Sequence, residues 1–140
     1  MKNLILQPDA GRAKFALLLG TNPLVTNCMT LLQRRPRIAA DIKGIQRAGG
    51  KVLVVDPRRT ETVKVADEHV PIRSGTDLFL LVGMIGRTIE TRRYHRAFVT
   101  RHVHGFEFWE ELARRIDLDR VATVTGLSRW LVDRLAWGVL

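Results

Sequence analysis

The stretch that decides the fold is Lys51–Asp77, KVLVVDPRRTETVKVADEHVPIRSGTD. It opens at positions 52–55 with a short apolar run after a glycine pair, which is typical of a strand buried on both faces. Asp56-Pro57 ends the predicted strand, because proline cannot donate to a β-ladder. Ligands of open α/β sheets bind outside the carboxyl ends of strands, so the next loop is a candidate site. An acid followed by arginines at this place can hold a ribose hydroxyl and an anion. The hydrogen-bonding residues of the loop are Asp56, Arg58, Arg59, Thr60 and Thr62.

A first strand and a tight turn are predicted upstream. The apolar run Ala13–Leu19 ends at a glycine, as a strand that leads into a turn does. Gly20-Thr21-Asn22-Pro23 follows, where glycine allows close backbone approach to a ligand and proline suits the first turn of a helix. Exposed N–H groups at a helix start attract phosphate. From these residues alone, a plain strand-to-helix turn is the other interpretation.

The segment between the two strands predicts a βαβ unit. In Arg37–Ala48, three isoleucines at positions 38, 42 and 45 share one helical face, and Gly49-Gly50 ends the helix. The two flanking strands should therefore be parallel, with a right-handed crossover. His69–Ile72 predicts a short third strand near a sheet edge.

The remainder of the chain is predicted to be helical. Thr76 can cap a helix that carries Asp77 in its first turn and continues to about Glu90. That helix is apolar nearly all round, so we expect it to be well buried. Three more helices are predicted, over residues 106–116, from Asp119 to Gly126, and after a cap at Ser128.

Four motifs in order carry a resemblance to a known family. Asp56–Thr62 (DPRRTET), Ala66-Asp67, Ile72–Asp77 (IRSGTD) and the upstream Gly20–Pro23 (GTNP) resemble the molybdopterin oxidoreductase family. This family includes formate dehydrogenases, nitrate reductases and dimethyl sulfoxide reductases. The resemblance covers roughly residues 17–135, whereas the family's catalytic subunits are several times longer, so it implies an internal fragment of a catalytic subunit.

The resemblance implies an α/β fold of the Rossmann-like, three-layer kind, with a short, mostly parallel sheet and a helical C-terminal part. Residues 1–90 would bind a guanine dinucleotide arm of the molybdenum cofactor, molybdopterin guanine dinucleotide, and residues 91–140 would be a helical extension of the same domain. The GTNP loop would lie along the cofactor's phosphates, the loop after Asp56 would contact ribose and phosphate, and Asp77 would accept hydrogen bonds from guanine. The implied cofactor-binding residues are Gly20, Thr21, Asn22, Pro23, Asp56, Arg58, Thr60, Gly75 and Asp77.

The sequence departs from the family in two places. Ser74 stands where the family usually has proline before its GTD, so that turn should be less rigid. Cys28 is the only cysteine and follows the GTNP loop, so this chain has neither the family's iron–sulfur cysteines nor its molybdenum ligand. By resemblance the parent is an enzyme, but we expect this chain alone to be inactive and to depend on remaining domains or a companion subunit. We assign no catalytic or metal-ligating residue.

Composition leaves other classes open. The 140 residues suffice for one domain, and the net charge of +9 reflects 23 basic residues, of which 18 are arginine. A stand-alone nucleotide-binding module is one alternative. A basic nucleic-acid-binding protein is another, because Thr91–Arg101 mixes arginines with Tyr94, yet no nucleic-acid motif accompanies them and a solvated surface is favoured. His102 and His104 lack further metal ligands at suitable spacing. The chain as it stands is predicted to be cytoplasmic, with any export signal in a missing upstream region.

Overall fold

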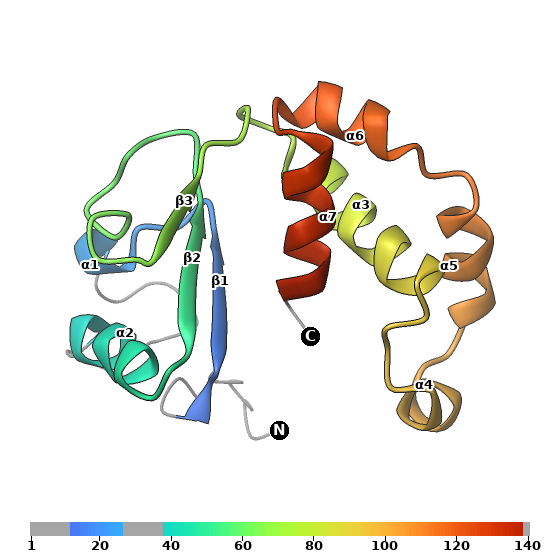
Figure 1. Cartoon of the computed structure of the whole chain (residues 1–140), viewed down its shortest axis with the longest axis horizontal. Helices are drawn as coiled ribbons and strands as arrows, with labels where there is room; N and C mark the ends of the chain where they lie inside the picture. Colours follow the sequence, from blue (N-terminus) through green and yellow to red (C-terminus); the bar gives the residue numbers. More distant parts are fainter. Residues whose placement is uncertain (1–11, 27–37, 139–140) are drawn as a thin grey trace, which may run out of the picture. The chain divides into compact units, whose positions relative to one another are not determined.

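The computed structural model describes residues 12–26 and 38–138. Cys28 and Arg37, the first residue of the predicted helix Arg37–Ala48, lie outside these residues. The chain divides into two compact units, Met1–Pro71 and Ile72–Leu140, and each is described by itself. The structure is mixed α/β, with a parallel sheet of three strands and seven helices in the described part of the chain (Figure 1).

The sheet of the first unit consists of β1 (Phe15–Leu19), β2 (Lys51–Val55) and β3 (Glu68–Val70), hydrogen-bonded in that order and all parallel (Figure 1). The predicted parallel pairing of the first two strands is therefore confirmed. β3 lies at an edge, as predicted, but it begins at Glu68 and ends before Pro71. Its predicted continuation to Ile72 is wrong, because Pro71 has no N–H to donate to the ladder.

The predicted burial of β2 is confirmed. The side chains of residues 52–55 are all buried, and successive residues of a strand point to opposite faces. On one face, Val52 packs against Ile42 and Ile45 of α2 (Ile38–Arg47), which lies within one residue of the predicted helix at each end. The isoleucine stripe of α2 thus covers the central strand.

The second unit is built around α3 (Asp77–Glu90), which packs against three of the other helices of this unit. These three are α5 (Phe106–Ala113), α6 (Leu118–Thr125) and α7 (Arg129–Gly138), and α4 (Arg96–His102) lies between α3 and α5 in the chain. The predicted bounds of α3 are confirmed. The predicted burial of α3 is confirmed only in part, since Leu80 is fully buried whereas Leu78 is 68% exposed.

Glycines in the middle of α3 allow close contact with α6 and with the connection that precedes it. A Cβ added at Gly83 would lie 2.9 Å from Cγ1 of Val121 in α6, and one added at Gly86 would lie 2.5 Å from Cδ1 of Ile116. Both glycines are buried. Glycine is unfavourable inside a helix, but at these two positions the absence of a side chain allows close packing against the neighbouring residues.

Caps set the ends of the later helices. The side chain of Asp117 accepts hydrogen bonds from the N–H groups of Asp119 and Arg120, so α6 begins at Leu118 rather than at the predicted Asp119. The predicted cap of α7 is confirmed, because Ser128 Oγ accepts from Leu131 N at 3.2 Å. α5 ends three residues before the predicted residue 116.

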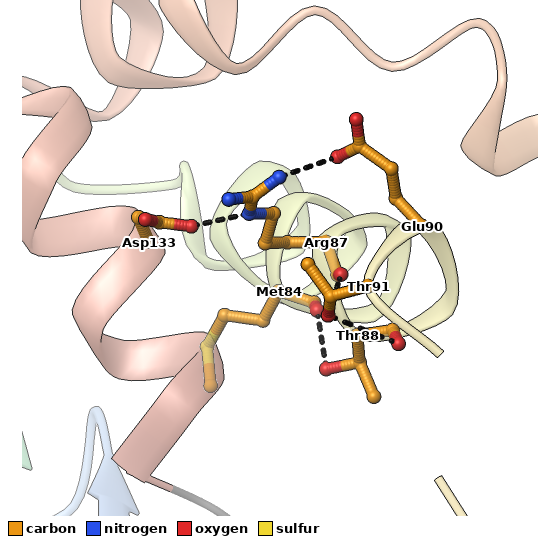
Figure 2. Close-up of polar contacts among 6 residues, drawn as sticks. All are labelled: Met84, Arg87, Thr88, Glu90, Thr91 and Asp133. Atoms are coloured by element: carbon orange, nitrogen blue, oxygen red, sulfur yellow. Dashed lines mark hydrogen bonds and ion pairs between the residues drawn. The ribbon is translucent and has the colours of Figure 1, made fainter. Parts of the chain in front are cut away.

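An arginine joins α3 to α7. Arg87 donates through Nε to Asp133 of α7 and through Nη1 to Glu90 Oε2 at 2.9 Å (Figure 2). The hydrogen bonds to Glu90 and Asp133 raise the pKa of Arg87 above its ordinary value. All three side chains are partly exposed, so this network adds specificity to the α3–α7 contact more than stability.

Candidate nucleotide site at the strand ends

The carboxyl ends of β1 and β2 meet at one edge of the sheet. Leu19 and Val55, the last residues of the two strands, are register partners, and Gly20 N donates to Val55 O at 2.9 Å. The GTNP loop and the loop after Asp56 therefore start side by side. The convergence expected of a βαβ unit is present in the first unit.

Gly20 has a φ of +56°, in the left-handed region that favours glycine. A Cβ at this position would meet nothing within 4 Å, so backbone conformation rather than space selects glycine here. Pro23 is buried and begins α1 (Pro23–Thr26), in the helix start predicted for it.

Asp56 is the buried acid of this edge, with 6% of its surface exposed. Its Oδ1 accepts a hydrogen bond from Arg58 N at 2.8 Å, which closes a tight turn directly after β2. Its backbone oxygen lies 2.8 Å from Nε2 of His69, in the neighbouring strand β3. The other carboxylate oxygen, Oδ2, makes no hydrogen bond to any described residue. Within residues 12–26 and 38–138, it is therefore an acceptor without a donor at the strand end.

The other candidates in this loop differ in exposure. The side chains of Arg58 and Arg59 are exposed, whereas Thr60 is only 5% exposed. Thr60 Oγ1 accepts from Val63 N at 3.4 Å, so this hydroxyl shapes the loop. The exposed guanidinium groups of Arg58 and Arg59 are cations that an anion can reach.

Sequence reasoning missed a network of hydrogen bonds between the two loops. Asn22 Oδ1 accepts from Thr62 Oγ1 at 2.7 Å and from Thr62 N at 3.2 Å, and Asn22 Nδ2 donates to Glu61 Oε2 at 2.7 Å. Glu61 and Thr62 stand in the DPRRTET motif, but they lie about 40 residues from Asn22. A periodic sequence pattern gives no information on contacts between residues so far apart. Only the presence of both motifs in one chain could have indicated these hydrogen bonds.

Two predicted site residues, Gly75 and Asp77, belong to the second unit. Gly75 has a φ of +77° and forms the predicted turn. The predicted side-chain cap by Thr76 is wrong: its hydroxyl oxygen accepts no hydrogen bond from the first turn of α3, and the hydroxyl instead donates to Arg73 O at 2.7 Å. Asp77 is the first residue of α3, is half-buried, and makes no side-chain hydrogen bond to a described residue.

Two histidines and one arginine after α3 make contacts within the second unit. His95 Nδ1 accepts from Phe98 N at 2.9 Å and so caps α4, while the His102 ring packs 4.8 Å from that of Phe98. The guanidinium of Arg93 stacks over Trp137 at 4.0 Å. Within the ranges 12–26 and 38–138, no three His, Cys, Asp or Glu side chains gather as a metal site.

A hollow lies along α4, but its lining offers no buried polar group. The lining residues are all exposed, and they are His95, Arg96, Ala97, Phe98, Thr100, Arg101 and His102. The sheet edge, which combines a buried acid with a network between loops, is the better candidate site. None of the described helices is both long and apolar enough to cross a bilayer.

The chain is similar to parts of several longer proteins, which are named for different reactions. Acetylene hydratase of Syntrophotalea acetylenica is 41% identical over 96 residues, 69% of this chain and 13% of that protein. Formate dehydrogenase H of Escherichia coli is 33% identical over 93 residues, 66% of this chain and 13% of that protein. The assimilatory nitrate reductase catalytic subunit of Bacillus subtilis is 30% identical over 125 residues, 89% of this chain and 16% of that protein. No protein-family profile matches.

A solved structure agrees with these relatives. Acetylene hydratase from Pelobacter acetylenicus superposes with a TM-score of 0.77 and 30% identity, over 93% of this chain and 17% of that one. These relatives are much longer proteins, and this chain spans only 13–17% of their length. The chain belongs to the molybdopterin oxidoreductase family, as its motifs predicted.

Proposed function

We propose that this chain supplies part of the site that binds the molybdenum cofactor in a molybdopterin oxidoreductase, by holding one guanine dinucleotide arm. The observation that carries the proposal is Asp56, a buried carboxylate at the carboxyl end of β2 whose Oδ2 has no partner among the described residues. Such an oxygen can accept a hydrogen bond from a ribose hydroxyl.

The surroundings of Asp56 suit the rest of a nucleotide. The GTNP loop begins beside the last residue of β2, and Arg58 is exposed next to it. Backbone N–H groups of the loop and the Arg58 guanidinium would lie along phosphate, while the Thr60 hydroxyl holds the loop's shape. The consecutive order of β1, β2 and β3 is that of one half of a dinucleotide-binding sheet, which supports a Rossmann-like description.

The second unit contributes Gly75 and Asp77 to the proposal. An Asp77 carboxylate without a partner among the described residues can accept two hydrogen bonds from a guanine edge, and the Gly75 backbone would assist it. The proposed nucleotide-binding part is therefore residues 1–90, although α3 itself packs against later helices. Residues 91–140 would be a helical extension.

The relatives' names support a role in cofactor binding rather than in substrate choice. A hydratase, a dehydrogenase and a reductase share this segment, although their names give different reactions. A segment common to such proteins suits the cofactor they would have in common. The cofactor, when bound, supplies the redox chemistry, and the protein supplies binding and orientation. Oxidoreductase activity, and dependence on further domains or a companion subunit, are part of this proposal.

A calorimetric titration with GDP and ADP tests the proposal, using the wild type and Asp77→Ala. We expect GDP to bind more tightly, and Asp77→Ala to weaken GDP by about 1.5–3 kcal/mol, the contribution of charge-assisted hydrogen bonds. Glu107→Ala is the matched control, because Glu107 is an exposed acid in the first turn of α5. Equal affinity for ADP, or a loss of GDP affinity in both variants, would contradict the assignment of Asp77.

A further inference from the structure

We infer that Asn22, Glu61 and Thr62 form a clasp that positions the two loops of the nucleotide site, and that the Asn22 side chain acts by positioning rather than by touching the ligand. This inference rests on the proposed function for its effect on nucleotide binding. The existence of the clasp itself rests on hydrogen bonds within the first unit.

The Asn22 carboxamide is already engaged at both ends. Its oxygen has two lone pairs, and both accept hydrogen bonds from Thr62, one from the hydroxyl and one from the backbone N–H. Its nitrogen donates to Glu61. Only the second N–H of this nitrogen has no acceptor among the described residues, so a phosphate that recruited any other atom of the carboxamide would break bonds of the clasp.

Thr62 makes the clasp a structural unit. It is fully buried, its hydroxyl donates to Asn22 Oδ1, and the same oxygen accepts from Leu24 N at 3.3 Å. The contacts join segments 38–40 residues apart in the sequence. Because a buried polar group left unpaired is unfavourable, loss of the bonds to Thr62 should change the spacing of the loops.

Glu61 gives the clasp a charged end. It is exposed, and the hydrogen bond from Asn22 lowers the pKa of its carboxyl below the ordinary value, with Lys64 and Arg58 adding smaller effects in the same direction. The carboxylate therefore accepts from the Asn22 amide as an ion, which strengthens the bond. The polarity of this pair is fixed: Asn22 donates and Glu61 accepts.

That polarity allows a reversal experiment. In Asn22→Asp the donor to Glu61 is lost and two carboxylates face each other, whereas in the double variant Asn22→Asp/Glu61→Gln the new amide can donate to the new carboxylate. Thr62 can donate to position 22 in every variant. The readouts are GDP affinity by calorimetry and the hydrogen-exchange protection of the Thr62 amide by NMR.

For a positioning role, Asn22→Asp should lower GDP affinity on the order of tenfold, and the double variant should return to within about threefold of the wild type. Thr62 protection should follow the same pattern. If Asn22 contacts phosphate directly, the aspartate repels it in both variants, and GDP affinity stays low while protection is restored. That outcome would overturn the inference.

The proposed function and the clasp can fail separately. If the wild type binds no GDP, the proposed function is contradicted, and so is the proposed effect of the clasp on GDP affinity. Thr62 protection then still decides whether the clasp exists: loss in Asn22→Asp and recovery in the double variant support it, and equal protection in all variants contradicts it.

Discussion

Different kinds of interaction stand out within each of the two compact units. The loops of the first unit are joined by hydrogen bonds of side chains far apart in the sequence, as between Asn22 and Thr62. The second unit relies on helices that pack against α3, with Leu80 fully buried and Gly83 in close contact with Val121. Substitutions in the Asn22–Thr62 network should therefore change loop geometry, and substitutions at the contacts of α3 should change stability. Each prediction below breaks or sharpens this comparison.

The largest expected effect is on the packing of α3. Leu80→Ala should lower the free energy of unfolding by about 2–5 kcal/mol, because it removes a fully buried side chain and leaves a cavity. Leu78→Ala is the matched control in the same helix and should change it by less than about 0.5 kcal/mol, since Leu78 is largely exposed. All three tryptophans lie in the second unit, so urea unfolding followed by tryptophan fluorescence reports on it. Equal losses in both variants would contradict this account of α3.

Two helical glycines should respond to alanine with opposite signs. Gly83→Ala gains helix propensity but forces its Cβ against the branched Val121 side chain, so we expect a net loss of about 1 kcal/mol in unfolding free energy. Gly44→Ala in α2 meets nothing within 4 Å and should stabilise by about 0.5–1 kcal/mol. Thermal unfolding followed by circular dichroism measures both. Stabilisation by Gly83→Ala would show that the α3–α6 contact is looser than described.

The smallest effect is expected at the ion pair of Figure 2. Asp133→Asn should lower the free energy of unfolding by about 0.2–1 kcal/mol, because Arg87 and Asp133 are only partly buried. The difference from the wild type should shrink in high salt. Glu111→Gln is a control at a more exposed pair, with Arg115, and should have less effect. A salt-independent loss above that range would indicate a role in packing instead.

Much of this architecture could be predicted because it depends on local patterns. The apolar run 52–55, the isoleucine stripe of α2 and the cap at Ser128 each report on neighbouring residues, and all three are confirmed. The predicted Thr76 cap is wrong because a Thr hydroxyl can also bond to nearby carbonyl oxygens, and here it is directed to Arg73 O rather than to the N–H groups of α3.

The candidate site was predictable in outline only. Parallel strands bring Gly20 and Asp56 to one edge, which topology alone predicts. The pairing of Asn22 with Thr62 depends on side-chain geometry between segments 40 residues apart, which no pattern encodes. The roles of the nine predicted cofactor residues stay predictions, with Asn22 reassigned to positioning in our inference.

The most direct test of the nucleotide site is an NMR titration of the ¹⁵N-labelled chain with GDP. We predict the largest amide shift changes at residues 20–22, 56 and 58–60, and their loss in Asp56→Asn, which keeps the shape of the side chain but replaces one of the two accepting carboxylate oxygens by an NH2 group that only donates. Shift changes that instead concentrate along Arg96–His102, or that persist unchanged in Asp56→Asn, would contradict the placement of the nucleotide at the strand ends.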